Sequence, residues 1–218
     1  ALTFSAANTY TGATAVIGGT LALTGSGALA ANSAITINGG TFDGGPRNAT
    51  YNQGNNSGIV FGANGGVFAG TGTNTLVGVS GGLTAFVVPA NATAVVTANV
   101  NITNTTPHNY SGLASVGSGG TLTVNGRIIS YNSGGEIWLG GGGTLRINNT
   151  ANRFSGLGIW GAAGGTITAA DFSALGSYAF LVMGQTPGGG AATFIYTGLA
   201  TNTTFSFKPE CLAPTILN

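Results

Sequence analysis

The sequence predicts an all-β protein whose chain coils into a parallel β-helix, or β-solenoid, with no significant helix. Three observations support this fold class: short runs of alternating apolar and hydroxyl residues, glycine pairs that recur between the runs, and a scarcity of charged helix formers. Only 4% of the 218 residues are charged, and 41 residues are glycine. Because glycine costs about 1 kcal/mol relative to alanine inside a helix, strands and turns are the expected local structures.

The predicted strands are short and extend over most of the chain. Each is rich in Val, Ile, Thr, Leu and aromatic residues and is bounded by Gly or Asn, which is typical of strands between tight turns. With 43% hydrophobic residues, the chain can also bury a core. The segments that carry this pattern are 14–24, 33–42, 58–70, 121–131, 135–140, 143–149, 165–169, 192–198 and 203–208.

Glycine pairs give the strands a rhythm. They begin at residues 18, 39, 65, 81, 119, 142 and 164, and three of the gaps (18 to 39, 39 to 65 and 142 to 164) are 21, 26 and 22 residues long. Strand-and-turn repeats of about 20 to 25 residues predict a solenoid, for which this chain would supply about nine or ten coils. A β-sandwich or a Greek-key barrel would also explain the strands, but not this rhythm.

The charge and the cysteine content of the chain argue against several classes of function. The formal net charge of +1 creates no basic surface to attract nucleic acid, and no apolar run approaches the roughly 18 residues of a membrane span. The single cysteine, Cys211, excludes an intramolecular disulfide and a multi-cysteine metal site. With one lysine and almost no glutamate, the chain is typical of a secreted surface protein; Ala1 is either left by signal cleavage or a fragment boundary.

The first repeat is the most regular. Residues 2–43 resemble the autotransporter-associated β-strand repeat of bacterial surface proteins, in which Asn-Thr-Tyr/Phe-Thr/Ser-Gly precedes a short strand and then Gly-Gly-Thr-Leu. The resemblance implies a right-handed parallel β-helix outside the cell, delivered by bacterial-type secretion, that serves mostly as non-catalytic stalk or adhesin. The matching residues are Asn8, Tyr10, Thr11, Gly12, Gly19, Thr20 and Leu21, then Asn109, Tyr110, Ser111, Gly112, Gly120, Thr121 and Leu122, and finally Asn152, Phe154, Ser155, Gly156, Gly165, Thr166 and Ile167.

The sequence divides into two parts. Residues 1–177 form the predicted β-solenoid of degenerate repeats, and residues 178–218 depart from the repeat and form a predicted cap or tail. The tail is our expected assembly junction, with Lys208, Glu210 and Cys211 as its contact residues; Cys211 is either an intermolecular or free thiol or a small buried side chain. Because autotransporters end in a membrane β-barrel that this chain does not contain, we expect a passenger fragment, a released product or a stand-alone secreted protein.

Acidic residues are few and scattered. Asp43 and Arg47 lie in a predicted turn, where a local ion pair or turn hydrogen bond is the simpler interpretation and a substrate-binding pair is the alternative. A sugar-cleaving β-helix needs two carboxylates within about 10 Å of each other. Such a pair would have to come from the four acids of the chain, Asp43, Glu136, Asp171 and Glu210.

Other catalytic motifs match the sequence in residue type and spacing, but without the structural context that they require. His108 and Ser111 would need a distant aspartate to complete a hydrolytic triad. Residues 78–82 (GVSGG) match a nucleophile elbow and residues 156–161 (GLGIWG) match a dinucleotide-binding glycine motif, but neither is followed by a predicted helix. We therefore expect no catalytic, cofactor or metal site.

Aromatic and asparagine residues supply possible contact sites. Trp138, Trp160 and Tyr131 either pack in the core or face outward, where they could stack on sugar rings. Glycosylation sequons occur at Asn48, Asn55, Asn91, Asn101, Asn104, Asn109, Asn148 and Asn202.

These observations predict a non-enzymatic, extracellular structural protein. The ends of a solenoid expose unpaired backbone groups, and residues 1–3 offer no capping helix or charge cluster, so we expect the protein to stack on itself head to tail into fibres. The first alternative is an adhesive passenger region that binds glycan or extracellular matrix through Trp138, Trp160 and Tyr131. The second alternative is a glycan-degrading β-helix enzyme.

Overall fold

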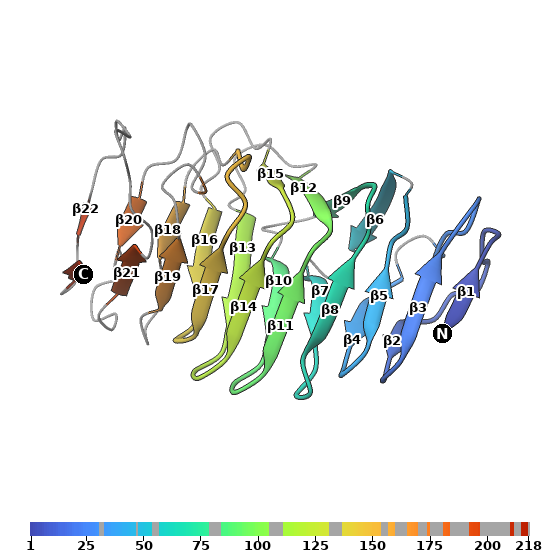
Figure 1. The fold of residues 1–218 in the computed structure, drawn as a ribbon, viewed down its shortest axis with the longest axis horizontal. Helices are drawn as coiled ribbons and strands as arrows, with labels where there is room; N and C mark the ends of the chain where they lie inside the picture. Colours follow the sequence, from blue (N-terminus) through green and yellow to red (C-terminus); the bar gives the residue numbers. More distant parts are fainter. Residues whose placement is uncertain are drawn as a thin grey trace.

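A computed structural model of the chain contains three parallel sheets whose strands stack along one axis, with the two chain ends at opposite ends of the stack (Figure 1). The residues that the structure describes are 1–30, 33–46, 48–53, 57–78, 84–104, 111–130, 137–153, 157–159, 165–169, 174, 181–183, 192–196, 210–211 and 215–217.

Two long sheets run the length of the stack. The ten-stranded sheet contains, in order, β1 (Leu2–Phe4), β3 (Thr20–Leu23), β5 (Thr41–Asp43), β8 (Gly66–Ala69), β11 (Thr93–Val96), β14 (Thr121–Val124), β17 (Thr144–Ile147), β19 (Thr166–Ala169), β21 (Ala192–Tyr196) and β23 (Thr215–Leu217). The nine-stranded sheet contains β2 (Thr14–Val16), β4 (Ile35–Ile37), β7 (Ser57–Phe61), β10 (Thr84–Val88), β13 (Ser111–Val116), β16 (Ile137–Gly140), β18 (Leu157–Ile159), β20 (Leu181–Met183) and β22 (Glu210–Cys211).

The described strands of a third sheet lie in the middle of the stack. Its four strands are β6 (Ala49–Gln53), β9 (Thr73–Gly78), β12 (Asn99–Asn104) and β15 (Ile128–Ser130). All ladders in the three sheets are parallel. The predicted all-β, parallel β-solenoid is therefore confirmed, and the described residues contain no α-helix.

The predicted number of coils, nine or ten, needs correction. Among the described residues, four turns have a strand on each of three sides: β5–β6–β7, β8–β9–β10, β11–β12–β13 and β14–β15–β16. Elsewhere the described strands alternate between the two long sheets. On the third side near the start of the chain, small residues form one isolated bridge, Ala7 to Ala28, in place of a ladder. Small side chains bury too little apolar surface there to hold a third strand.

The glycine pairs that begin at residues 18, 39, 65, 119 and 142 mark one corner of the solenoid, where the chain leaves the nine-stranded sheet and enters the ten-stranded one. The pair at residue 81 follows β9 and lies outside the described residues. Gly18, Gly39, Gly65 and Gly119 adopt positive φ at this corner, which glycine does without steric cost. At Gly65 a Cβ atom would also lie 1.7 Å from the backbone oxygen of Thr93 in the next turn. Asn91, with a φ of 60°, occupies the same place before β11. The corner therefore explains the rhythm seen in the sequence.

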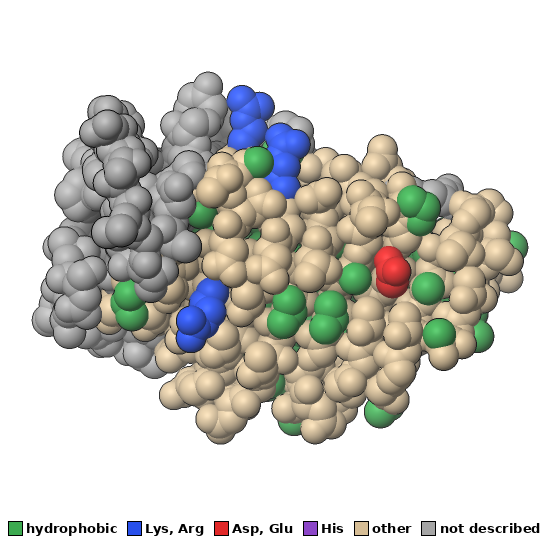
Figure 2. Space-filling model, viewed as in Figure 1, with side chains coloured by type: hydrophobic (Ala, Val, Ile, Leu, Met, Phe, Trp, Pro, Cys, Tyr) green, Lys and Arg blue, Asp and Glu red, His purple; other side chains and the backbone are tan. Residues whose placement is uncertain are grey.

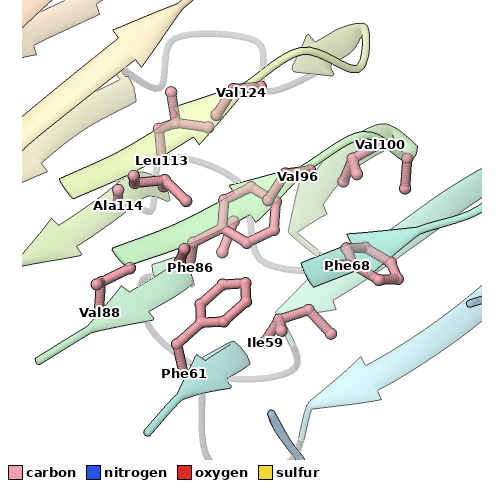
Figure 3. Close-up of a cluster of buried hydrophobic side chains, with 14 of the residues drawn as sticks. Ile59, Phe61, Phe68, Phe86, Val88, Val96, Val100, Leu113, Ala114 and Val124 are labelled. Carbon is pink, nitrogen blue, oxygen red and sulfur yellow. The ribbon is translucent and has the colours of Figure 1, made fainter. Parts of the chain in front are cut away.

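The core consists of apolar columns that run along the stack. In one column of the ten-stranded sheet, register pairs align one inward residue from each strand. Its members are Leu2, Leu21, Phe42, Phe68, Val96, Val124, Ile147 and Ala169. Figure 3 shows how the side chains of the two long sheets meet between them, with Phe61 and Phe86 projecting from the nine-stranded sheet toward the other side.

Aromatic rings reinforce this core where the three-sided turns begin. The rings of Phe42 and Phe68 are stacked, with centroids 5.7 Å apart and planes inclined by 4°. Phe42 also meets Tyr51 edge to face at 5.9 Å, which ties the ten-stranded sheet to the four-stranded sheet. Such pairs add about 0.5–1.5 kcal/mol each to the free energy gained by burying apolar surface.

We predict that Phe68→Ala lowers the free energy of unfolding by about 3–5 kcal/mol, because it opens a cavity beneath the stacked rings. Val95→Ala is the control: Val95 lies on the outer face of the same sheet and is only half-buried, so its loss should cost less than about 1 kcal/mol. Urea unfolding followed by circular dichroism measures both. Equal losses would contradict the inward and outward assignment.

Candidate functional site

Most of the side chains selected from the sequence lie outside the described residues. Arg47, His108, Tyr131, Glu136, Trp160, Asp171 and Lys208 belong to segments that the structure does not describe. Ser111, Trp138, Glu210 and Cys211 lie in strands whose backbone pairing is defined but whose side chains are not described. Their roles in catalysis, contact or assembly remain predictions, as does the boundary at residue 178.

The two glycine motifs are placed in part. Gly78 ends β9, and the rest of the elbow motif at 78–82 lies outside the described residues. Within the motif at 156–161, residues Leu157–Ile159 form β18, a strand of the nine-stranded sheet. A dinucleotide site requires the motif to open a helix, so this segment does not have the required local structure.

The repeat residues of the first turn hold neighbouring turns together. The side-chain amide of Asn8 donates to the backbone oxygen of Ala28 at 3.0 Å, one turn further on. The hydroxyl of Tyr10 hydrogen-bonds that of Thr14, which lies 2.9 Å from the hydroxyl of Ser33 in the next turn. Asn8 thus contacts the next turn directly, and Tyr10 is connected to it through Thr14.

Buried asparagine performs the same task deeper in the solenoid. Asn74 is completely buried in β9, where its carbonyl oxygen accepts from the Tyr51 hydroxyl at 3.4 Å. Its amide nitrogen donates to the backbone oxygens of Gly72 and Asn99, each at 3.3 Å. Buried amides that lose such partners are costly, so this residue connects three successive turns of the four-stranded sheet.

Asp43 has a turn hydrogen bond. Its Oδ1 atom accepts from the backbone N–H of Gly45 at 2.8 Å, which is the simpler of the two roles expected for it. Beside it a shallow groove of about 420 Å³ crosses several turns. Thr24, Pro46, Thr71 and Thr97 line this groove together with Asp43. Among these residues, threonine hydroxyls and the Asp43 carboxylate are the groups to which sugar hydroxyls can hydrogen-bond.

The pKa of the nearby Tyr51 phenol depends on its burial and on the charge of Asp43. Burial raises the pKa of the phenol well above the usual value, and the negative charge of Asp43 raises that pKa further. The phenol therefore stays neutral and donates its proton to Asn74.

The first strands form an exposed edge. Among the described strands, β1 pairs with β3 alone and β2 pairs with β4 alone. Leu2 begins the apolar column described above and is 57% exposed, whereas Leu21 is 7% exposed and Phe42 is fully buried. Ile17, beside β2, is 76% exposed. The apolar column that is buried in the later turns from Leu21 to Ala169 is therefore open to solvent at Leu2.

The backbone of β1 is also oriented for pairing. The carbonyl oxygen of Phe4 accepts from Thr24, so Phe4 directs its backbone groups toward β3. Alternate residues of a strand direct their backbone groups to opposite sides. Thr3 accordingly presents its N–H and C=O to the open side of β1. The sequence predicts an open solenoid end, but it does not point to Leu2 or Thr3, because their exposure depends on register.

Comparison with known proteins identifies no relatives: no family model, no curated protein and no solved structure matches the chain. The resemblance to the autotransporter-associated repeat therefore remains a prediction. Among the described residues, no helix has the length and apolar character to cross a bilayer. The same residues include no group of three or more His, Cys, Asp or Glu side chains arranged to hold a metal ion.

We predict that Asn74→Leu destabilises the fold by about 1–3 kcal/mol, because the buried Tyr51 hydroxyl and Asn99 carbonyl lose their partner. Asn148→Leu is the matched control, since Asn148 is exposed and its amide bonds to Asn125 in contact with water. Thermal melts of the two variants measure the difference. The assignment fails if the two substitutions lower the melting temperature equally.

Tyr51 also predicts a dependence of stability on alkaline pH. The phenol ionises near pH 10 in the unfolded chain but only at higher pH in the folded one, so folding loses stability as pH rises above about 10. Tyr51→Phe removes the titrating group. Melting temperatures measured from pH 9 to 12 should fall more steeply for the parent chain than for the variant, and parallel curves would contradict this assignment.

Proposed function

We propose that this chain is a non-enzymatic, extracellular structural protein, a β-solenoid stalk that stacks end to end. The observation that carries the proposal is the exposed edge of β1 and β2, where an apolar column starts in solvent and Thr3 directs its backbone groups outward. A further turn in the same register would bury Leu2 and satisfy those groups. The low charge and the glycine-rich repeat support the extracellular assignment.

The partner at this edge is a second copy of the chain. Any strand that pairs there must be parallel and must alternate apolar and polar residues with a period of two. The strands of the two long sheets meet both requirements, and a head-to-tail contact of this kind repeats without closing. We also infer a right-handed coil, since crossovers between parallel strands of one sheet are right-handed in nearly all proteins.

A second candidate function is adhesion to glycan. The groove beside Asp43 favours it, because threonine residues and Asp43 are among the residues that line it across several turns. The aromatic residues expected to make such contacts, Trp138, Trp160 and Tyr131, supply no further support, since their side chains are not among those described. The structural role is the better supported of the two, because it uses the arrangement of the whole solenoid.

We predict that Thr3→Pro prevents end-to-end assembly. Proline lacks the one N–H that β1 directs to its open side, and it leaves the bonds to β3 intact because those come from Leu2 and Phe4. Thr3→Val, which keeps the N–H, is the control and should assemble like the parent chain. Sedimentation velocity and electron microscopy at rising protein concentration measure the assembly.

Two results would overturn the proposal. One is a parent chain that remains monodisperse at high concentration. The other is a Thr3→Pro variant that assembles as readily as Thr3→Val.

A further inference from the structure

One corner of the solenoid gathers basic and amide side chains. We call it the arginine corner and define it as residues 125–127 and 148–153, which connect the ends of β14 and β17 to the third side. Arg127 precedes β15, and Arg153 forms a parallel bridge with Ile129 of that strand. The two arginines are thus one turn apart and two residues out of register. Both are exposed, and Figure 2 shows two basic side chains adjoining at the upper edge of the molecule.

The arginine corner is held in place by hydrogen bonds. The Nε atom of Arg127 donates to the backbone oxygen of Ala151 at 3.1 Å, which anchors its guanidinium group to the next turn. Asn152 is 3% exposed; its Oδ1 accepts from the backbone N–H of Ile128 at 2.7 Å, and its amide donates to the backbone oxygens of Asn149 and Ala174. The positions of the two arginines therefore do not depend on a ligand.

The arginine corner contains three further amide side chains, of which Asn125 and Asn148 are exposed and Asn149 is half-buried. Asn148 donates through its side chain to Oδ1 of Asn125 at 2.8 Å, and Asn149 donates to the backbone oxygen of Asn125 at 3.1 Å. Each exposed amide keeps donor or acceptor capacity beyond these bonds. Amides of this kind can bond the hydroxyls of a sugar beside a charged group.

The charge of the arginine corner is not balanced by its described surroundings. Asp43 is the one acidic side chain among those described, and it lies in β5, three strands before β14 in the ten-stranded sheet. Two adjacent positive charges repel each other, whereas a bound anion would be attracted by both. Guanidinium groups form paired hydrogen bonds with planar carboxylates and with sulfates, which favours ligands that carry those groups.

We propose that the arginine corner binds an acidic polysaccharide, with its carboxylate or sulfate groups on Arg127 and Arg153 and its hydroxyls on the neighbouring amides. Nucleic acid fits less well, because its affinity depends on many phosphate contacts and the chain has a net charge of only +1. The site adds glycan binding to the structural role and does not require end-to-end stacking. A single chain carries all of its residues.

The test measures binding of the 218-residue chain to polygalacturonate, to a sulfated glycosaminoglycan, to neutral dextran and to duplex DNA, at low and at physiological salt. We expect at least one acidic polysaccharide to bind, with affinity that falls as salt rises, and dextran not to bind. Arg127→Gln and Arg153→Gln should each weaken that binding by about tenfold. Arg146→Gln, which removes the same charge from the outer face of β17, should leave it unchanged.

Several results would overturn this inference. They are an equal loss of affinity in Arg146→Gln, no loss in the two corner variants, or tighter binding to DNA than to either polysaccharide. If Arg127→Gln unfolds, Arg127→Lys tests the role of the guanidinium group instead, because it keeps the positive charge and removes the planar group. Arg153→Gln is the second safeguard, since it leaves the bond from Arg127 to Ala151 in place. Because the Thr3→Pro variant should bind as the parent chain does, a failure of stacking and a failure of glycan binding are distinguishable.

Discussion

The structure depends on one constraint, the parallel in-register pairing of each turn with the next. Neighbouring strands lie about 4.8 Å apart, so a side chain in one turn stacks on the residue at the same register in the turns before and after it. Inward positions become continuous apolar columns, such as the one that runs from Leu2 to Ala169. Each turn is stabilised mainly by its two neighbours, which is the general energetic property of solenoids.

This constraint explains why the sequence has so little charge. A charged residue repeated at one register would stack on its own kind and repel it, whereas threonine and asparagine can hydrogen-bond along the column. The described charges are accordingly solitary or paired at corners. Asp43 caps a turn, and Arg127 and Arg153 share the arginine corner. These charged positions, which depart from the repeat, are the places where we expect the solenoid to bind a ligand.

Sequence alone could predict the parts of the fold that repeat. Alternating runs predicted the strands, and the glycine pairs predicted a corner that proved to need positive φ at Gly39 and Gly65. The third side could not be predicted in this way, because its described strands belong to four turns and pack around residues such as Asn74. The groove at Asp43 and the adjacency of the two arginines depend on register between turns, which a single sequence does not display.

We propose that the protein is built, and extends itself, by adding turns in the same parallel register. X-ray diffraction from aligned assemblies of the 218-residue chain tests this proposal. We expect a reflection at about 4.8 Å along the assembly axis, because strands in every copy lie across that axis. Strands that run along the axis, or a protein that forms no aligned assembly at high concentration, would contradict it.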